Sequence, residues 1–144
     1  MFSIRLAINS DINAICGFDH IARQDDQRRA FIRRSVEREN CFVIATDDQI
    51  TGYAVLEYSF YEQGFISMLY LHHAYRRQGA GLMLMQHLES VCQTRKLFTS
   101  TNLSNLPMQS LLAKLDYKLS GVIHNLDEGD PELVYVKFIG QGVG

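Results

Sequence analysis

The segment from residue 65 to residue 92 changes from one hydrophobic pattern to another at a short basic turn. Residues 65–71 are apolar except for Ser67, which is typical of a buried strand. After the turn, apolar side chains recur at helical spacing, at Leu82, Met85, Leu88, Val91 and Cys92. The segment therefore predicts a buried strand, a tight turn and a helix of roughly 15 residues, so the fold combines a sheet with helices.

The turn carries Arg76, Arg77, Gly79 and Gly81 where the helix should begin. Helix N-termini present unpaired backbone N–H groups and the positive end of the helix dipole, which together bind phosphate. Glycines let a ligand approach the backbone closely, and arginines add positive charge. The turn predicts a pyrophosphate site; the alternative is a tight turn whose arginines are merely solvated. The three-glycine dinucleotide fingerprint and the Gly-Lys-Ser/Thr phosphate loop are absent, which argues against those two nucleotide-binding classes.

The composition is that of one soluble globular domain over residues 1–144, with 47% hydrophobic and 21% charged residues. A net charge of −2 gives no overall attraction to nucleic acid or to anionic membranes, so we expect neither partner. The sequence has no apolar run long enough to cross a bilayer and no signal-peptide pattern. Three widely spaced cysteines predict free thiols in a reducing cytoplasm, and no Cys/His spacing predicts a metal site.

The remaining patterns give an order of elements for the whole chain. We expect strands over residues 2–7, 41–46, 50–60, 65–71, 97–101, 117–123 and 133–139, and helices near 12–16, 21–40, 82–92 and 108–115. The order is β-α-α-β-β-β-α-β-α-β-β. The three strands from 41 to 71 should run antiparallel, and the helix after Gly79 should carry the chain to a parallel strand at 97–101.

This order, with Arg76-x-x-Gly79-x-Gly81 after the fourth strand, resembles the GNAT superfamily of N-acetyltransferases. A second segment, which begins at Asn105 and continues through Met108, Leu111, Leu112, Leu115 and Tyr117, looks like the second cofactor motif of that family. The resemblance covers nearly the whole chain. It implies an α/β fold with a mixed, mostly antiparallel sheet of about seven strands flanked by about four helices.

The resemblance implies acetyl-CoA as donor and a primary amine as acceptor, joined by direct attack in a ternary complex. The strand that would pair with the pantetheine arm is matched by Leu69, Tyr70 and Leu71, and Asn105 matches an asparagine that bonds the same region. The pyrophosphate turn is matched by Arg76, Arg77, Gln78, Gly79, Ala80, Gly81 and Leu82. One alternative is a non-catalytic acyl-CoA-binding module of the same fold. Another is a nucleotide-binding regulatory domain, which would leave the segment after Asn105 unexplained.

The catalytic groups cannot be carried over from the family. The tyrosine that commonly acts as the acid corresponds to Leu112, and positions where relatives often carry a base glutamate correspond to Ser67 and Ser100. Among the residues present, we expect Glu57 to be the base, since its alternation partners on the strand are apolar; an exposed strand carboxylate is the alternative. Tyr117 is the candidate acid, with Tyr70, Tyr135, His72 and His73 as further proton carriers; strand tyrosines commonly only pack, and histidines near turns commonly lie at the surface.

An acidic segment separates the last two strands, with four carboxylates in residues 127–132. In this family the loop between the last two strands can border the acceptor pocket, so Asp127 and Glu128 are candidates to attract a cationic amine. The alternative is a solvated turn. We therefore expect a small, cationic amine or a peptide amine as acceptor, and a homodimer is possible through the sheet edges near the last strands.

Overall fold

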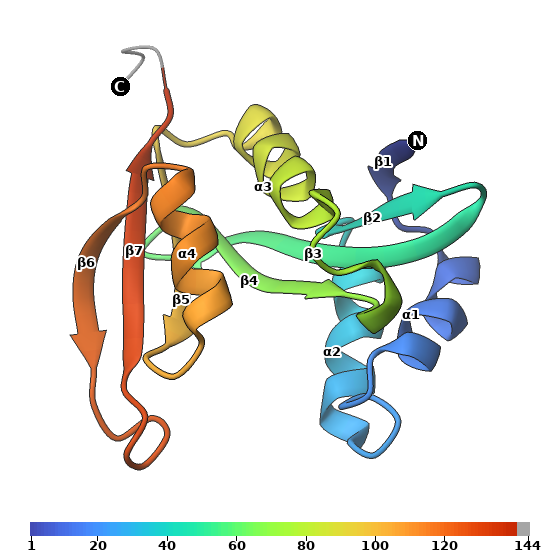
Figure 1. Ribbon diagram of the computed structural model, residues 1–144, viewed down its shortest axis with the longest axis horizontal. Coiled ribbons are helices and arrows are strands. Elements are labelled where there is room, and N and C mark those ends of the chain that lie inside the picture. The colour runs from blue at the N-terminus through green and yellow to red at the C-terminus, as the bar shows by residue number, and fades with distance from the viewer. Residues whose placement is uncertain (141–144) are drawn as a thin grey trace. The chain divides into compact units, whose positions relative to one another are not determined.

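The computed structural model describes residues 1–140 and contains the expected elements in the expected order (Figure 1). In chain order they are β1 (Phe2–Leu6), the 3₁₀ turn η1 (Asn9–Asp11), α1 (Ile12–Phe18), α2 (Asp26–Glu37), β2 (Cys41–Thr46), β3 (Gln49–Phe60), β4 (Gln63–Leu71), the 3₁₀ turn η2 (His73–Tyr75), α3 (Ala80–Val91), β5 (Lys96–Asn102), α4 (Leu106–Lys114), β6 (Lys118–Ile123) and β7 (Glu132–Phe138). The predicted mixed α/β fold is confirmed.

The strands form one hydrogen-bonded sheet in the order β1-β2-β3-β4-β5-β7-β6. The predicted parallel pair is present: β4 lies parallel to β5, with Gly64 opposite Leu97 and Ile66 opposite Thr99. The pairs β1–β2, β2–β3, β5–β7 and β6–β7 are antiparallel. A parallel pair needs a crossover connection, and α3 supplies it.

The chain divides into two compact units. Unit 1 comprises residues 1–56 and 68–88, and unit 2 comprises residues 57–67 and the chain from residue 89 onward. Strands β3 and β4 and helix α3 each contribute to both units, so neither unit is a continuous stretch of chain.

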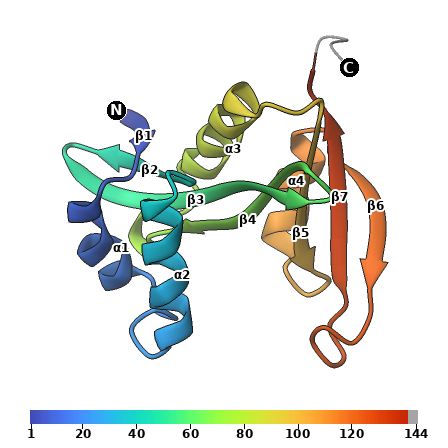
Figure 2. The same cartoon turned by 180° about the vertical axis from the view of Figure 1, so that it is seen from behind.

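Unit 1 has helices on both faces of its strands. Helices α1 and α2 lie on one face of β2 and β3 (Figures 1 and 2), where helix residues and strand residues share one buried cluster that includes Ile15, Ile32, Val36, Val43, Tyr53 and Val55. Neighbouring residues on a strand point to opposite faces. Phe42 accordingly contacts the ring of His87 on α3, with ring centroids 5.3 Å apart. The β2–β3 pair is thus covered on both sides.

Helix α2 is shorter than predicted, and two aspartates explain why. The backbone N–H groups of Ile21 and Ala22 donate to Asp19 Oδ1, which holds the chain in a turn before the helix. Asp25 then acts as the N-cap, because its Oδ1 accepts from the N–H groups of Gln27 and Arg28. The helix therefore begins at Asp26 and not near residue 21.

Unit 2 is built on β5 and β7, with α4 lying over them (Figure 1). Alternate residues of β5 are buried, namely Leu97, Thr99 and Thr101, and Leu112 is the fully buried side chain of α4. The ends of β3 and β4 join this unit through a hairpin whose two connecting residues, Tyr61 and Glu62, have φ values of 52° and 62°. Two consecutive positive φ values are typical of the tight hairpin turn that matches strand twist.

Candidate functional site

The predicted phosphate turn lies in unit 1, between β4 and α3. Helix α3 begins at Ala80, directly after Gly79, whose φ of +85° is accessible to glycine without strain. A Cβ placed on Gly79 would meet no atom within 4 Å, so the backbone here faces open space. The turn therefore offers a ligand close access to the N-terminus of α3, where the first backbone N–H groups have no partner within the helix.

The two arginines of the turn point to different places. Arg76 folds back along β4: its Nε donates to the carbonyl of Leu71 at 3.2 Å, and its guanidinium lies 5.6 Å from the centroid of the Tyr70 ring. Arg77 is exposed, has a φ of 66°, and makes no hydrogen bond or ion pair with any residue in the range 1–140. Arg77 is thus the arginine that is free to bind an anion at the start of α3.

Tyr70 occupies the centre of an aromatic and cationic cluster in unit 1. Its ring stacks on Tyr53 at 6.1 Å and lies 6.2 Å from Phe18, and the guanidinium of Arg28 lies 5.8 Å from its centroid. Its hydroxyl oxygen contacts His20, accepting from the backbone N–H at 3.2 Å and meeting the ring atom Nδ1. The sequence separates these two residues by 50 positions, and only the packing of the loop after α1 against β4 brings them together.

A buried ionic network supports this cluster. Asp19 is fully buried and accepts from the hydroxyl of Tyr53 at 2.6 Å and from Nε of Arg28 at 2.9 Å. Burial alone would raise the pKa of Asp19, but the hydrogen bonds from Tyr53 and Ala22 and the charge of Arg28 outweigh it and lower that pKa. Burial and the same carboxylate raise the pKa of Tyr53. Asp19 is therefore a fixed anion that orients Arg28 and Tyr53 beneath Tyr70.

Glu57, the predicted base, lies in unit 2 and is half-buried. Its Oε2 accepts from the hydroxyl of Ser67 at 2.5 Å, and its Oε1 accepts from the hydroxyl of Ser59 at 2.9 Å. Ser67 is on the neighbouring strand β4, at a position where the family resemblance expects a glutamate. The carboxylate of Glu57 thus lies within hydrogen-bonding distance of that position, held from the adjacent strand.

Tyr117, the predicted acid, is buried in unit 2 and donates to Oε2 of Glu89 at 2.9 Å. Oε1 of the same carboxylate is paired with Nζ of Lys137 at 3.0 Å. Burial and the Glu89 carboxylate raise the pKa of Tyr117. These contacts favour the packing alternative over the acid role for Tyr117.

Asn105 lies in unit 2 and caps α4. Its Oδ1 accepts from the N–H of Met108 at 3.2 Å, and Pro107 occupies the first turn, where a missing N–H costs nothing. Its Nδ2 group donates no hydrogen bond to the part of the chain that the structure describes. The side chain therefore has one structural role and one unused donor.

The acidic segment between β6 and β7 is tied to the turn before α4, also in unit 2. Asp127 accepts from Nδ2 of Asn102 at 2.9 Å, and Asp130 accepts from the backbone N–H and the hydroxyl of Ser104 at 2.9 and 2.5 Å. Glu128 is exposed and has no bond to the described chain. Of the two predicted acceptor-binding carboxylates, Asp127 is anchored and Glu128 is available.

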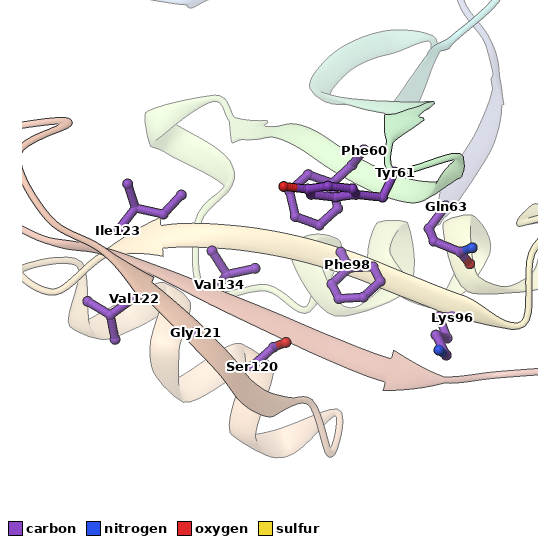
Figure 3. A pocket seen from close by; sticks show the side chains of 10 residues that line it. All are labelled: Phe60, Tyr61, Gln63, Lys96, Phe98, Ser120, Gly121, Val122, Ile123 and Val134. Atoms are coloured by element: carbon purple, nitrogen blue, oxygen red, sulfur yellow. The ribbon is translucent and has the colours of Figure 1, made fainter.

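Unit 2 also carries a groove of about 540 Å³ that the sequence did not predict (Figure 3). Phe60, Tyr61 and Phe98 lie in its middle, Gln63 and Lys96 at one end, and Val122, Ile123 and Val134 at the other. The ring centroids of Phe60 and Phe98 are 5.1 Å apart. No local pattern predicts this groove, because its residues come from five strands that are spread along the sequence.

Among residues 1–140, no helix combines the length and apolarity needed to cross a membrane. Within the same range, no three His, Cys, Asp or Glu side chains gather into a group that could hold a metal ion. All three cysteines are free thiols, and burial raises the pKa of Cys41 to about 12.

Known proteins similar to this chain share its fold and one sequence family. The model of the acetyltransferase (GNAT) family matches residues 8–117. A solved GNAT-family acetyltransferase from Bacillus cereus is 30% identical, with a TM-score of 0.91 over 98% of this chain and 99% of its own. No curated protein sequence matches the chain.

Two more distant structures show the fold alone. The ribosomal-protein-S18-alanine N-acetyltransferase of Escherichia coli is 18% identical, with a TM-score of 0.78 over 100% of this chain and 99% of its own. The yncA protein of Salmonella typhimurium, solved with its cofactor acetyl-CoA, is 15% identical, with a TM-score of 0.77 over 99% of this chain and 96% of its own. Likeness at this level of identity carries no information about the acceptor.

Proposed function

Because the chain belongs to the GNAT family of acetyltransferases, we propose that it transfers the acetyl group of acetyl-CoA to a primary amine by direct attack in a ternary complex. The observation that carries the proposal beyond the family is the contact between Glu57 and Ser67, which holds a carboxylate that can take a proton from the acceptor. A primary amine has a pKa of about 10 and is protonated at neutral pH, so it must lose a proton before it can attack. A held carboxylate is a suitable acceptor for that proton.

The donor is assigned to the β4–α3 turn. In this proposal the backbone of Leu69, Tyr70 and Leu71 pairs with the pantetheine arm, and the pyrophosphate binds at residues 76–82. The open space at Gly79 and the unpaired charge of Arg77 support that assignment. A hydrogen bond from a charged group contributes about 1.5–3 kcal/mol, which corresponds to about tenfold or more in affinity.

Asn105 is proposed as a second contact to the CoA arm, through Nδ2. Its Oδ1 is used by the helix cap, which fixes the orientation of the amide and turns the other end outward from the cap. The capping role and the proposed binding role therefore use different atoms of one side chain. That separation makes the two roles experimentally distinguishable.

The base is assigned to Glu57. Ser67 occupies one of the two positions where relatives often carry this carboxylate, and the Ser67 hydroxyl bonds the Glu57 carboxylate. We therefore propose that the carboxylate has moved from β4 to β3, with Ser67 and Ser59 as the groups that hold it in place. Each carboxylate oxygen accepts one hydroxyl and keeps a lone pair for the amine proton.

For the acceptor, we propose a cationic amine, either small or on a peptide. The anchoring of Asp127 and Asp130 places Glu128 on a held loop, where its charge would attract a cation without large entropic cost. The homodimer that the sequence suggested would use β6, the terminal strand of the sheet, whose Leu119, Val122 and Ile123 are exposed. The free thiols support a cytoplasmic location.

The test is release of CoA thiol from acetyl-CoA in the presence of a panel of amines, with direct mass measurement of the acetylated product. We expect thiol release that depends on one class of amine and that falls sharply in Glu57→Gln. Tight binding of acetyl-CoA without thiol release from any amine in the panel would instead favour the non-catalytic acyl-CoA-binding module. Protection of the fold by ATP or NAD but not by CoA would favour the nucleotide-binding alternative.

A further inference from the structure

The contact between His20 and Tyr70 determines which hydrogen bonds the Tyr70 hydroxyl can accept and donate. The hydroxyl oxygen of Tyr70 accepts from the backbone N–H of His20 at 3.2 Å, and the imidazole Nδ1 of the same residue approaches that oxygen. If Nδ1 carries the ring proton, Tyr70 accepts two hydrogen bonds from one residue, and its own hydroxyl proton is free to point elsewhere. In that tautomer the Tyr70 hydroxyl has one proton that it can donate to a third group.

Two guanidinium groups lie close to the ring of Tyr70. From α2, Arg28 lies 5.8 Å from the ring centroid, and from the start of the turn Arg76 lies 5.6 Å from it. The nearby carboxylate of Asp19 is already hydrogen-bonded, because it accepts from Nε of Arg28 and from the hydroxyl of Tyr53. Tyr53 belongs to β3, and its ring stacks on Tyr70. His72, two residues after Tyr70, packs on Phe18, with ring centroids 5.6 Å apart.

His20 also provides a route to solvent. It is exposed and lies in the loop after α1, whereas Tyr70 is half-buried on β4. An imidazole can accept a proton at one ring nitrogen while it releases one at the other. The pair therefore connects a partly enclosed hydroxyl to bulk water through one side chain.

We propose that His20 and Tyr70 form a proton relay that protonates the departing CoA thiolate. The inference rests on the proposed acetyl transfer. As the amine nitrogen bonds to the carbonyl carbon, the carbon–sulfur bond breaks and the electron pair leaves with sulfur. The Tyr70 hydroxyl gives its proton to that sulfur, Nδ1 of His20 gives its proton to the phenolate, and Nε2 of His20 takes a proton from water. The protonated amine loses two protons in all: Glu57 takes the first before attack, and the second, lost as the amide forms, balances the proton that the thiol gains.

The relay gives this chain an acid that the family position does not supply. The residue at that position, Leu112, is fully buried and cannot donate a proton. Tyr70 is separate from the Tyr117–Glu89–Lys137 network, so the two tyrosines can be tested independently. His20 would act only through Tyr70 and is a positioning and relaying residue.

The test compares Tyr70→Phe with Tyr75→Phe, a matched loss of a hydroxyl on the neighbouring η2 turn. Tyr70→Phe keeps the β4 backbone, and we expect its kcat to fall at least tenfold while its Kd for CoA, measured by calorimetry, stays within error of wild type and its thermal unfolding stays cooperative. Tyr75→Phe should keep wild-type kcat. A folded Tyr70→Phe variant with wild-type kcat would overturn the relay.

A second arm tests His20 by chemical rescue. We expect His20→Ala to lose kcat and to regain much of it on addition of free imidazole, whereas imidazole should leave Tyr70→Phe unchanged. A purely structural role of His20 would not be rescued by imidazole, so a lack of rescue in a folded His20→Ala variant would overturn the relaying role. If wild type releases no CoA thiol with any amine, the acetyl transfer itself is wrong, an outcome that the variants cannot produce.

Discussion

The hydroxyl of Ser67 lies 2.5 Å from Oε2 of Glu57, and the two residues belong to neighbouring strands. A short bond of this kind to an ionised carboxylate is among the stronger hydrogen bonds in proteins. It holds the Glu57 carboxylate beside Ser67, the β4 residue at a position where the family resemblance expects a glutamate. The contact is the basis of the first prediction.

Glu57→Gln should lower kcat by about 100-fold, the usual contribution of a general base, and leave the Kd for CoA unchanged. Ser67→Ala should lower kcat less, because the carboxylate remains but loses its orientation. Steady-state kinetics with the amine found in the panel, together with calorimetry for CoA, checks both. The kcat of Ser59→Ala, which removes the bond to Oε1, is compared with that of Ser67→Ala. If Glu57→Gln keeps the wild-type kcat, Glu57 is not the base.

Arg77→Gly should weaken CoA binding by about tenfold without destabilising the fold. Arg77 has a φ of 66°, a conformation that costs a non-glycine residue roughly 1 kcal/mol. Glycine removes this cost, which offsets its greater freedom in the unfolded chain. Calorimetry measures the affinity and urea unfolding measures the stability. Arg77→Lys, which keeps the charge, should retain most of the affinity; equal affinity in all three proteins would place the pyrophosphate elsewhere.

Asn105→Asp should separate capping from binding. Aspartate caps a helix as well as asparagine does, so the melting temperature should not change. Because aspartate lacks the Nδ2 donor and adds a negative charge, the affinity for CoA should fall. Asn105→Ala should lose both the affinity and about 1 kcal/mol of stability. If Asn105→Asp binds CoA with wild-type affinity, Asn105 caps α4 and does not contact CoA through Nδ2.

Tyr117→Phe should reduce stability and leave kcat unchanged. The hydroxyl contributes one bond to a carboxylate that keeps its partner Lys137, so the expected loss is about 1 kcal/mol. Thermal unfolding and steady-state kinetics measure the two effects in the same preparation. A collapse of kcat with an intact fold would restore Tyr117 as the acid.

Stability should fall in acid through Asp19. The pKa of this carboxyl is lowered in the folded protein, so its contribution is complete above the unfolded value of about 3.9 and is lost as pH falls through the folded value. Urea unfolding at pH 7, 4 and 3 should show this decline. Asp19→Asn should be less stable at pH 7 and should lose part of the pH dependence, whereas Asp47→Asn, in an exposed turn, should match wild type. An unchanged pH profile in Asp19→Asn would assign the acid sensitivity to other carboxyls.

The order of elements could be predicted because it depends on local periodicity. The parallel pairing of β4 with β5 followed from the crossover helix between them, and the glycine turn preceded α3 as expected. The start of α2 could not be predicted in this way, since it is set by side-chain bonds to Asp19 and Asp25.

The candidate site was predicted only in part, for a similar reason. Periodicity suggested that Glu57 points inward, but not that Ser67 would bond it. Nor could it predict that Arg76 turns back to Leu71, or that His20 meets Tyr70 from 50 residues away. Each of these contacts depends on how strands and loops distant in sequence pack together.

The two-residue connection at Tyr61 and Glu62 sets which residues of β3 and β4 lie beside each other. A hairpin with a turn of fixed length has a fixed register, and a shift by one residue would turn every following side chain to the opposite face. The length of this turn thus decides which residue of β3 stands beside Ser67. The insertion or deletion of one residue in this turn would therefore turn Glu57 away from Ser67.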